Sequence, residues 1–233
     1  MSSIAALIIT QNEEENIREC LESINWCDEI VLVDSYSEDQ TVAISREYTE
    51  KIYLRKFDDF AAQRNYALEK VESDWVLVID ADERVSGELK REIEEILSDN
   101  SHDVQAYKIP FKDYFLGKWI KYCGWYPDYH LRLFKNNHQL KYDGMVHENV
   151  KIKGKVNQLA NPLIHFTYKN LEHYINKMNH YTTLWSEDRD KKGKKIGMIN
   201  VLFSTCLEFI KKYFLKKGVL LGRQGLILSI LSS

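Results

Sequence analysis

The stretch Trp75-Val-Leu-Val-Ile-Asp80-Ala-Asp82-Glu83 decides the fold of this chain, because an apolar run ends abruptly on two carboxylates one residue apart. An uninterrupted run of Val, Leu and Ile predicts a strand that is buried on both faces, as in a parallel sheet. Parallel sheets bind ligands beyond the carboxyl ends of their strands. Carboxylates are costly to bury unpaired there, and a divalent cation bridging to a phosphate would satisfy them. A lone Asp-x-Asp can also be a solvated turn, so the motif needs support from its surroundings.

Two further apolar runs, residues 4–10 and 29–34, are each followed by polar residues. Residues 14–24 carry apolar side chains at helical spacing between these two runs. Further helices are predicted over residues 41–48, 60–71 and 87–97. Strands that alternate with helices predict right-handed crossovers and one parallel sheet. Thr10, Asp34 and Asp80 should therefore lie together at the carboxyl edge of neighbouring strands.

The first half of the chain lacks the glycine motifs that commonly hold phosphate. Its first glycine is Gly87, and neither G-x-G-x-x-G nor G-x-x-x-x-G-K-[ST] follows a strand. Rossmann dehydrogenases and P-loop enzymes need such glycines so that backbone amides can approach phosphate. This absence favours a cation held by carboxylates as the means of binding a phosphate.

Four motifs carry a resemblance to a known family. They are Thr10-x-Asn12-Glu13, Asp34-Ser35-x-Ser37-x-Asp39-x-Thr41, Gln63-Arg64-Asn65 and Asp80-Ala81-Asp82. In this order and spacing they resemble the family-2 glycosyltransferases of the GT-A fold. Residues 125–134, Val146-His147-Glu148 and residues 165–168 resemble the subgroup of lipopolysaccharide-core β-glucosyltransferases. The resemblance covers roughly residues 4–181.

The resemblance implies an α/β, GT-A-like fold, with a mostly parallel central sheet flanked by helices. We expect a glycosyltransferase domain over residues 1–188, with a nucleotide-binding half (1–100) and an acceptor half (101–188). A helical, basic extension is expected over residues 189–233.

The same resemblance gives roles to the carboxylates. Asp82 is expected to contact a Mg²⁺ or Mn²⁺ ion that bridges the donor diphosphate, because these hard cations prefer oxygen ligands. Asp80 is expected to contact the ribose or a metal-bound water. His147 is a candidate further metal ligand, as is His165, although a lone histidine near a strand end is commonly structural.

The nucleotide pocket is expected to form from the first two strand ends. Asp34 resembles the acid that recognises uridine, with Thr10, Asn12 and Glu13 lining the same pocket. Arg64 is expected to reach the uracil or the diphosphate. For Thr10 and Asp34 the alternative is helix N-capping, and for Arg64 it is an ordinary surface position.

The second half should supply the acceptor site. Asp128 lies in a segment rich in aromatic residues, which line sugar sites or pack in a core. Asp128 and Glu148 are the two candidates for the general base that takes the proton of the acceptor hydroxyl. We favour Asp128, because the base in this family usually comes from the segment after the Asp-x-Asp half.

Charge is unevenly distributed along the chain. Residues 189–233 hold ten lysines or arginines and two acids, whereas the whole chain has a net charge of −3. The apolar run over residues 218–231 contains Arg223 and is too short to span a bilayer. The tail is predicted to be either a helix packed on the domain or a basic surface resting on anionic lipid. Nucleic acid is an unfavourable partner, because the rest of the chain is acidic.

The resemblance implies an inverting enzyme that moves a hexose, expected to be glucose from UDP-glucose, onto a sugar of the lipopolysaccharide core or a related lipid-linked glycan. We expect a bacterial cytoplasmic location, peripheral at the inner leaflet of the membrane. The four cysteines have no metal-binding spacing, in keeping with reduced thiols. A sugar-nucleotide nucleotidyltransferase and a non-catalytic module that binds nucleotide sugar or lipid are the alternatives. The first normally has a glycine-rich loop after its first strand, and the second would not need the candidate bases.

Overall fold

The structure is a computed structural model of the 233-residue chain. It describes residues 2–99, 103–136, 140–143, 149–150, 152–168, 170–172, 174–176, 178–179, 182–183 and 198–233. The chain divides into two compact units, which are described separately below. The first comprises residues 1–111 and 129–165, and the second comprises residues 112–128 and 166–233.

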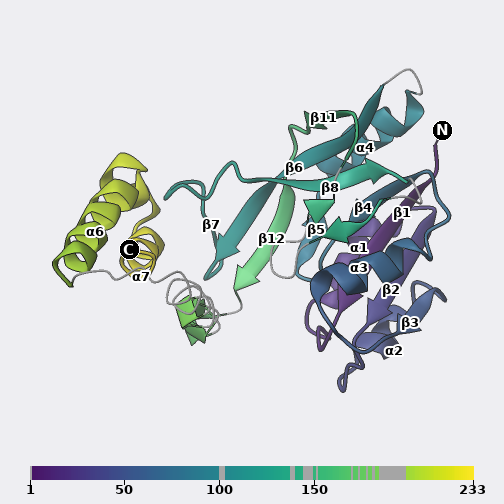
Figure 1. The fold of residues 1–233 in the computed structure, drawn as a ribbon, viewed down its shortest axis with the longest axis horizontal. Coiled ribbons are helices and arrows are strands. Elements are labelled where there is room, and N and C mark those ends of the chain that lie inside the picture. Colours follow the sequence, from purple (N-terminus) through teal and green to yellow (C-terminus); the bar gives the residue numbers. More distant parts are fainter. Residues whose placement is uncertain are drawn as a thin grey trace. The chain divides into compact units, whose positions relative to one another are not determined.

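The first unit begins with four parallel strands, as the sequence predicts. They are β1 (Ile4–Thr10), β2 (Glu29–Asp34), β3 (Ile52–Leu54) and β4 (Trp75–Val78), in the spatial order β3-β2-β1-β4. Thr10 on β1 is paired in register with Asp34 on β2, so these two strands end side by side. Figure 1 shows the four strands in purple and blue, with the connecting helices against them.

Helices cover both faces of these strands because successive side chains of each strand point to opposite faces. On β1, Ala6 and Ile8 pack in one apolar cluster with helix α1 (Ile17–Ile24) and helix α4 (Gly87–Ser98). Ala5 and Leu7 pack in the other cluster with helix α3 (Phe60–Leu68). Helix α2 (Thr41–Ser45) is a short turn after β2.

Helices α3 and α4 begin at side-chain caps. Asp59 accepts a hydrogen bond from the Ala62 amide at 2.7 Å, and Ser86 accepts one from the Leu89 amide at 3.2 Å. Such caps satisfy amide groups that have no partner inside the helix. They fix where each helix leaves the sheet.

Antiparallel strands extend the sheet beyond β4, in the order β4-β8-β6-β12-β5. Their bounds are β5 (Glu83–Val85), β6 (Val104–Phe115), β8 (Tyr129–Lys135) and β12 (Leu163–Tyr168). The remaining strands are β7 (Lys118–Trp119), β9 (Tyr142–Asp143), β10 (Asn149–Val150) and β11 (Lys155–Gln158). The sheet is therefore mixed, and only its first half is parallel throughout.

The second unit contains the C-terminal helices. They are α6 (Met198–Ile210), a π-helical turn η1 (Lys211–Leu215), a 3₁₀ turn η2 (Gly218–Leu221) and α7 (Arg223–Leu231). Phe115, Ile120 and Leu228 form part of its small core. Among the described residues, no helix is both long and apolar enough to cross a membrane.

The expected α/β fold and its helical C-terminal extension are confirmed. The division at residue 188 stays a prediction, because that boundary and Lys191 to Lys195 lie outside the described residues. All four cysteines are free thiols, with Cys20 and Cys123 buried and Cys206 exposed.

Candidate active site

The carboxyl ends of β1 and β2 form one continuous polar cluster. The Thr10 hydroxyl donates to Asp34 Oδ2 at 2.9 Å, and the Ser37 amide donates to Asp34 Oδ1 at 2.7 Å. Asp34 is fully buried and Thr10 nearly so. The residues before α1 and α2 are Asn16 and Gln40, so neither Thr10 nor Asp34 caps a helix. The capping alternative is therefore wrong.

The loops that follow β1 and β2 are held together by their own side chains. The Asn12 amide donates to Ser37 Oγ at 2.8 Å, and Asn12 Oδ1 accepts from the Glu38 amide at 2.9 Å. The Glu13 amide donates to Thr41 Oγ1 at 2.8 Å. Asn12 adopts a left-handed backbone conformation (φ 54°), which asparagine tolerates better than most residues. These contacts place both residues at the edge where Asp34 lies.

Asp80, the first acid of the Asp-x-Asp motif, is enclosed by two guanidinium groups. Arg64 Nη2 lies 2.9 Å from Asp80 Oδ1, and Arg132 Nη2 lies 2.8 Å from Asp80 Oδ2. Exclusion of water alone raises the pKa of Asp80, but Arg132 and Arg64 outweigh it and hold the pKa well below its usual value. Asp80 is therefore ionised, and each of its two oxygens accepts from one guanidinium group.

Glu83 completes this network from the start of β5. Its side chain is fully buried, and its carboxylate accepts from Arg132 Nη2 at 2.5 Å and from the Asp80 amide at 2.9 Å. Burial raises the pKa of Glu83 to about 7, although Arg132 opposes the shift. Glu83 thus fixes both Arg132 and the backbone at the motif.

Asp82 has a different environment from Asp80. Its side chain is 27% exposed, and Asp82 Oδ2 lies 3.5 Å from His165 Nε2. His165 reaches this position because β12 pairs antiparallel with β5, with His165 opposite Glu83. Asp82 and His165 therefore come together from distant parts of the sequence, which makes them the candidate metal ligands among the described residues.

These two residues fit a Mg²⁺ or Mn²⁺ ion only if other ligands complete its coordination. Groups of three or more potential protein ligands do not occur in the described part of the chain. Mg²⁺ commonly keeps several waters and binds one or two carboxylates together with substrate phosphates. The accessible carboxylate of Asp82 fits that mode of binding, whereas the adjacent imidazole of His165 is not a ligand that Mg²⁺ prefers. His147, the other predicted ligand, lies outside the described residues.

The structure describes only one of the two candidate bases. Asp128 is an exposed residue of the second unit and follows Pro127 directly. Glu148 lies outside the described residues. The aromatic residues before Asp128 contact one another, as Trp119 and Tyr126 do with ring centroids 5.5 Å apart.

Arg132 and Glu83 are the network residues that the sequence analysis did not assign. Arg132 lies between Leu131 and Leu133 in β8, and it is buried together with Leu133 and Phe134. A charged residue inside such a strand needs a buried partner, and that requirement was a usable signal. Glu83 was visible beside Asp82, but its partner is 49 residues away along the chain.

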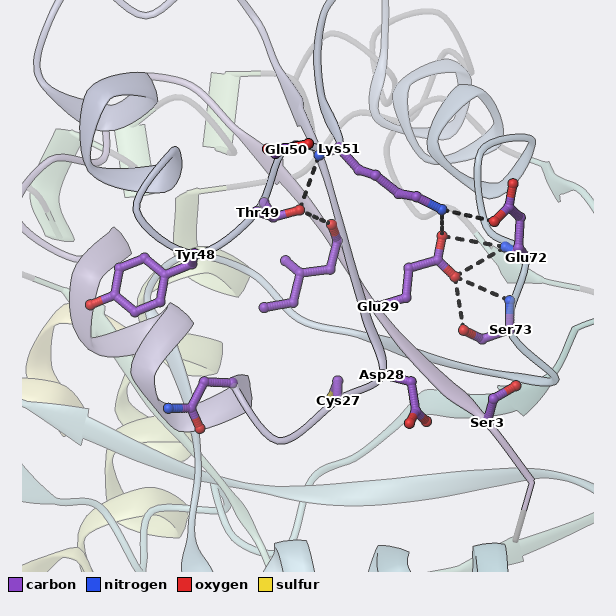
Figure 2. A pocket seen from close by; sticks show the side chains of 12 residues that line it. Ser3, Cys27, Asp28, Glu29, Tyr48, Thr49, Glu50, Lys51, Glu72 and Ser73 are labelled. Atoms are coloured by element: carbon purple, nitrogen blue, oxygen red, sulfur yellow. Dashed lines mark hydrogen bonds and ion pairs between the residues drawn. The ribbon is translucent and has the colours of Figure 1, made fainter.

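A hollow lies at the opposite, amino-terminal edge of the parallel strands. Its volume is about 570 Å³, and its lining includes Glu29, Lys51, Glu72 and Ser73. Lys51 Nζ lies 2.8 Å from Glu29 Oε1 and 3.0 Å from Glu72 Oε2, and Figure 2 shows both ion pairs as dashed lines. Burial opposes ionisation of Glu29, but Lys51 and Ser73 lower its pKa. The charges in this hollow hold the loops together, so we assign it a structural role.

Comparison with known proteins agrees with this geometry. The family model for glycosyl transferase family 2 matches residues 5–159. The lipopolysaccharide core biosynthesis glycosyltransferase LpsC of Rhizobium meliloti is 30% identical over 224 residues, covering 91% of this chain and 80% of LpsC. An uncharacterized glycosyltransferase of Rickettsia felis is 28% identical over 242 residues, covering 99% of this chain and 86% of the relative.

A similar solved structure is that of S. aureus TarS 1–349 in complex with UDP-GlcNAc. It superposes with a TM-score of 0.52 and is 16% identical, covering 72% of this chain and 59% of the TarS chain. At this identity the likeness concerns the fold alone. The match over residues 5–159 spans more than half of the sequence, and the chain belongs to glycosyl transferase family 2.

Proposed function

We propose that the protein transfers a hexose from a nucleotide sugar, UDP-glucose in the first instance, to a sugar hydroxyl of a lipid-linked glycan. The observation that carries this proposal is the convergence of Asp34, Asp80 and Asp82 at one edge of the parallel strands. In a family-2 glycosyltransferase, that edge is where a nucleotide diphosphate would bind.

The donor would be held by groups with separate tasks. Asp34, kept in place by Thr10 and Ser37, would accept a hydrogen bond from the base, with Asn12 and Glu13 at the rim of the same pocket. Asp80 would face the ribose, and Arg64 would face the uracil or the diphosphate. Asp82, with His165 beside it, would hold Mg²⁺ or Mn²⁺. A bound cation supplies positive charge that stabilises the leaving diphosphate.

In the transfer step, an acceptor hydroxyl attacks the anomeric carbon of the donor sugar. A new glycosidic C–O bond forms, the bond to the diphosphate breaks, and UDP leaves with the bonding electron pair. Asp128 or Glu148 accepts the hydroxyl proton. We favour Asp128, and we propose inversion to a β-linkage because the sequence resembles inverting enzymes.

The acceptor is proposed to be a lipopolysaccharide-core sugar or a related lipid-linked glycan, which places the reaction at the inner face of a bacterial membrane. LpsC, at 30% identity, supports this acceptor class. The C-terminal helices support peripheral binding, because they expose apolar side chains in the same segment as Lys211, Lys212, Lys216 and Lys217. Examples are Phe203, Phe214 and Leu220, which are 65%, 58% and 60% exposed. We propose that residues 189–233 form an extension that faces the membrane.

A donor panel tests the proposal directly. The full chain is incubated with Mn²⁺, a lipid-linked core acceptor, and UDP-glucose, UDP-galactose or UDP-N-acetylglucosamine, and UDP release is measured. We expect acceptor-dependent release with UDP-glucose and little with the other two donors. Release of pyrophosphate from UTP and a sugar phosphate would instead identify a nucleotidyltransferase. Nucleotide-sugar binding without turnover on the acceptor would identify a binding module.

A further inference from the structure

A hollow of about 450 Å³ lies within the second unit, and none of its lining residues is assigned to the donor. Two segments that are distant in the sequence form it. Its lining includes Lys121, Tyr122 and Tyr126 from one segment, and Leu215, Lys216 and Lys217 from the other.

Backbone contacts fix the two segments against each other. The amide of Cys123, which is buried in the small core, donates to the carbonyl of Lys216 at 2.9 Å. Gly124, which also lines the hollow, has a left-handed backbone (φ 82°), and a Cβ there would collide with the Lys216 ammonium. Lys217 is also left-handed, with φ 55°. These contacts hold the walls of the hollow together, and Gly124 leaves space for the side chain of Lys216.

The hollow is strongly basic. Among the described residues, no carboxylate lies within ion-pair distance of Lys121, Lys216 or Lys217, whereas nearby Lys211 lies 3.0 Å from Glu208. Three lysines that line one concave surface, with no described carboxylate within ion-pair distance of any of them, attract an anionic group. Their positions therefore indicate a ligand that carries negative charge.

Aromatic rings give the hollow a second kind of contact. Tyr126 packs edge-on against Trp119, at an interplanar angle of 85°, and Lys121 Nζ lies 5.5 Å from the centre of the Trp119 ring. A supported aromatic ring offers a rigid apolar face, such as the C–H face of a sugar ring requires. The candidate base Asp128 follows Pro127, which also lines the hollow.

We propose that this hollow, here called the lysine–tyrosine pocket, binds an anionic sugar of the acceptor, with a phosphate or carboxylate group on the lysines and the sugar ring on the tyrosines. This inference rests on the proposed function, because it names the class of acceptor for that reaction. An acceptor anchored here has its neighbouring hydroxyls beside the segment that carries Asp128.

Calorimetric titration of the full chain with simple probes tests the pocket. Glucose 6-phosphate and glucuronate are the anionic sugars. Glucose lacks the anionic group that the lysines would bind, and inorganic phosphate lacks the sugar ring that the tyrosines would contact. We expect both anionic sugars to bind at least about tenfold more tightly than glucose or phosphate. Equal binding of glucose 6-phosphate and glucose would overturn the role of the lysines. Equal binding of glucose 6-phosphate and phosphate would overturn the role of the tyrosines.

Charge-neutralising variants locate the binding. Lys121→Gln and Lys216→Gln should each weaken glucose 6-phosphate at least about tenfold. Lys211→Gln is the matched control, because it removes the same charge from the same region outside the pocket lining. Equal weakening in all three variants would reduce the effect to general surface charge and overturn the proposal.

Two further measurements distinguish a sugar site from a lipid headgroup site, and failure of this inference from failure of the proposed function. Glycerol 3-phosphate, a soluble headgroup analogue that has no acyl chain, should not displace glucose 6-phosphate at equal concentration, and displacement would show a lipid headgroup site and overturn the sugar assignment. UDP binding with Mn²⁺ reports the donor site independently, and we expect it to be unchanged in the pocket variants. If the pocket fails while UDP still binds and UDP-glucose is still turned over, only this inference falls. If UDP does not bind and UDP-glucose is not turned over, the proposed transferase function falls.

Discussion

Arg132 Nη2 lies 2.8 Å from Asp80 Oδ2, which joins the middle of β8 to the end of β4. The same nitrogen lies 2.5 Å from Glu83 Oε1. One buried guanidinium therefore serves two acids of the segment that carries the Asp-x-Asp motif. The position of Asp82 depends on this network, because its neighbours on both sides are held by it.

The first prediction concerns this shared cation. Arg132→Gln leaves Glu83 and one oxygen of Asp80 without their charged partner, so it should lower the free energy of unfolding by about 3–5 kcal/mol. Urea denaturation followed by circular dichroism measures the change. Arg91→Gln, at a side chain that is 70% exposed, is the control and should change little. The double variant Arg132→Gln/Glu83→Gln should recover part of the loss, and failure to recover any would mean that Glu83 is not the stranded charge.

The second prediction separates the two acids of the motif. Asp82→Asn should abolish transfer and weaken UDP binding only when Mn²⁺ is present, because the amide keeps the shape and loses the charge that holds a cation. The melting temperature should be nearly unchanged, since among the described residues Asp82 has no guanidinium partner comparable to those of Asp80. Glu88→Gln on the exposed face of α4 is the matched control. Full activity of Asp82→Asn at limiting Mn²⁺ would contradict the metal assignment.

The third prediction distinguishes the candidate bases. If Asp128 accepts the proton, Asp128→Asn should lower kcat by roughly 10²–10⁴-fold while the affinity for UDP barely changes. If Glu148 has that role, the large effect should appear in Glu148→Gln instead. Initial rates at saturating donor give kcat, and calorimetry gives the affinity for UDP. Small and equal effects in the two variants would exclude both residues as the base.

The parallel half of the fold could be predicted from the sequence because local signals there agree with the tertiary structure. The apolar run that begins at Trp75 predicts a strand buried on both faces. On β1, successive apolar side chains pack in the two core clusters in turn, as strand geometry requires. The edge cluster of Thr10 and Asp34 also followed, since parallel strands end at the same edge. These inferences needed only short stretches of sequence.

The antiparallel half could not be predicted in the same way. The pairing of His165 with Glu83, and of Arg132 with Asp80, joins residues that no local pattern relates. Arg64 was expected to face a ligand, and its salt bridge to Asp80 is visible only once α3 is packed on the sheet. Long-range pairing of this kind is set by tertiary context, which outweighs local preference in sheets.

The fourth prediction concerns pH and the amino-terminal hollow. The folded state lowers the pKa of Glu29 from 4.5, so its stabilisation is fully present above about pH 4.5 and is lost as the pH falls through the folded pKa. Glu29→Gln should therefore lower the free energy of unfolding by about 1–3 kcal/mol at pH 7, with a smaller difference below pH 4.5. Glu72→Gln removes the 84% exposed partner of the same Lys51 and should cost at most about 1 kcal/mol. A difference for Glu29→Gln that does not change with pH would contradict this account.

The last prediction concerns the exposed apolar side chains of the C-terminal helices. Full burial of one large apolar side chain contributes about 1.5–3 kcal/mol, so replacing Phe203, Phe214 and Leu220 together by serine should weaken binding to anionic vesicles at least about tenfold. Leu54→Ser is the control, because Leu54 is 50% exposed on β3, outside these helices. Co-sedimentation measures binding, which should fall as salt rises, because the attraction of lysines to anionic lipid is screened. Transfer to a lipid-embedded acceptor should slow in the triple variant, while transfer to a delipidated acceptor should be unchanged. Equal binding of the triple variant and the control would show that these helices do not face the membrane.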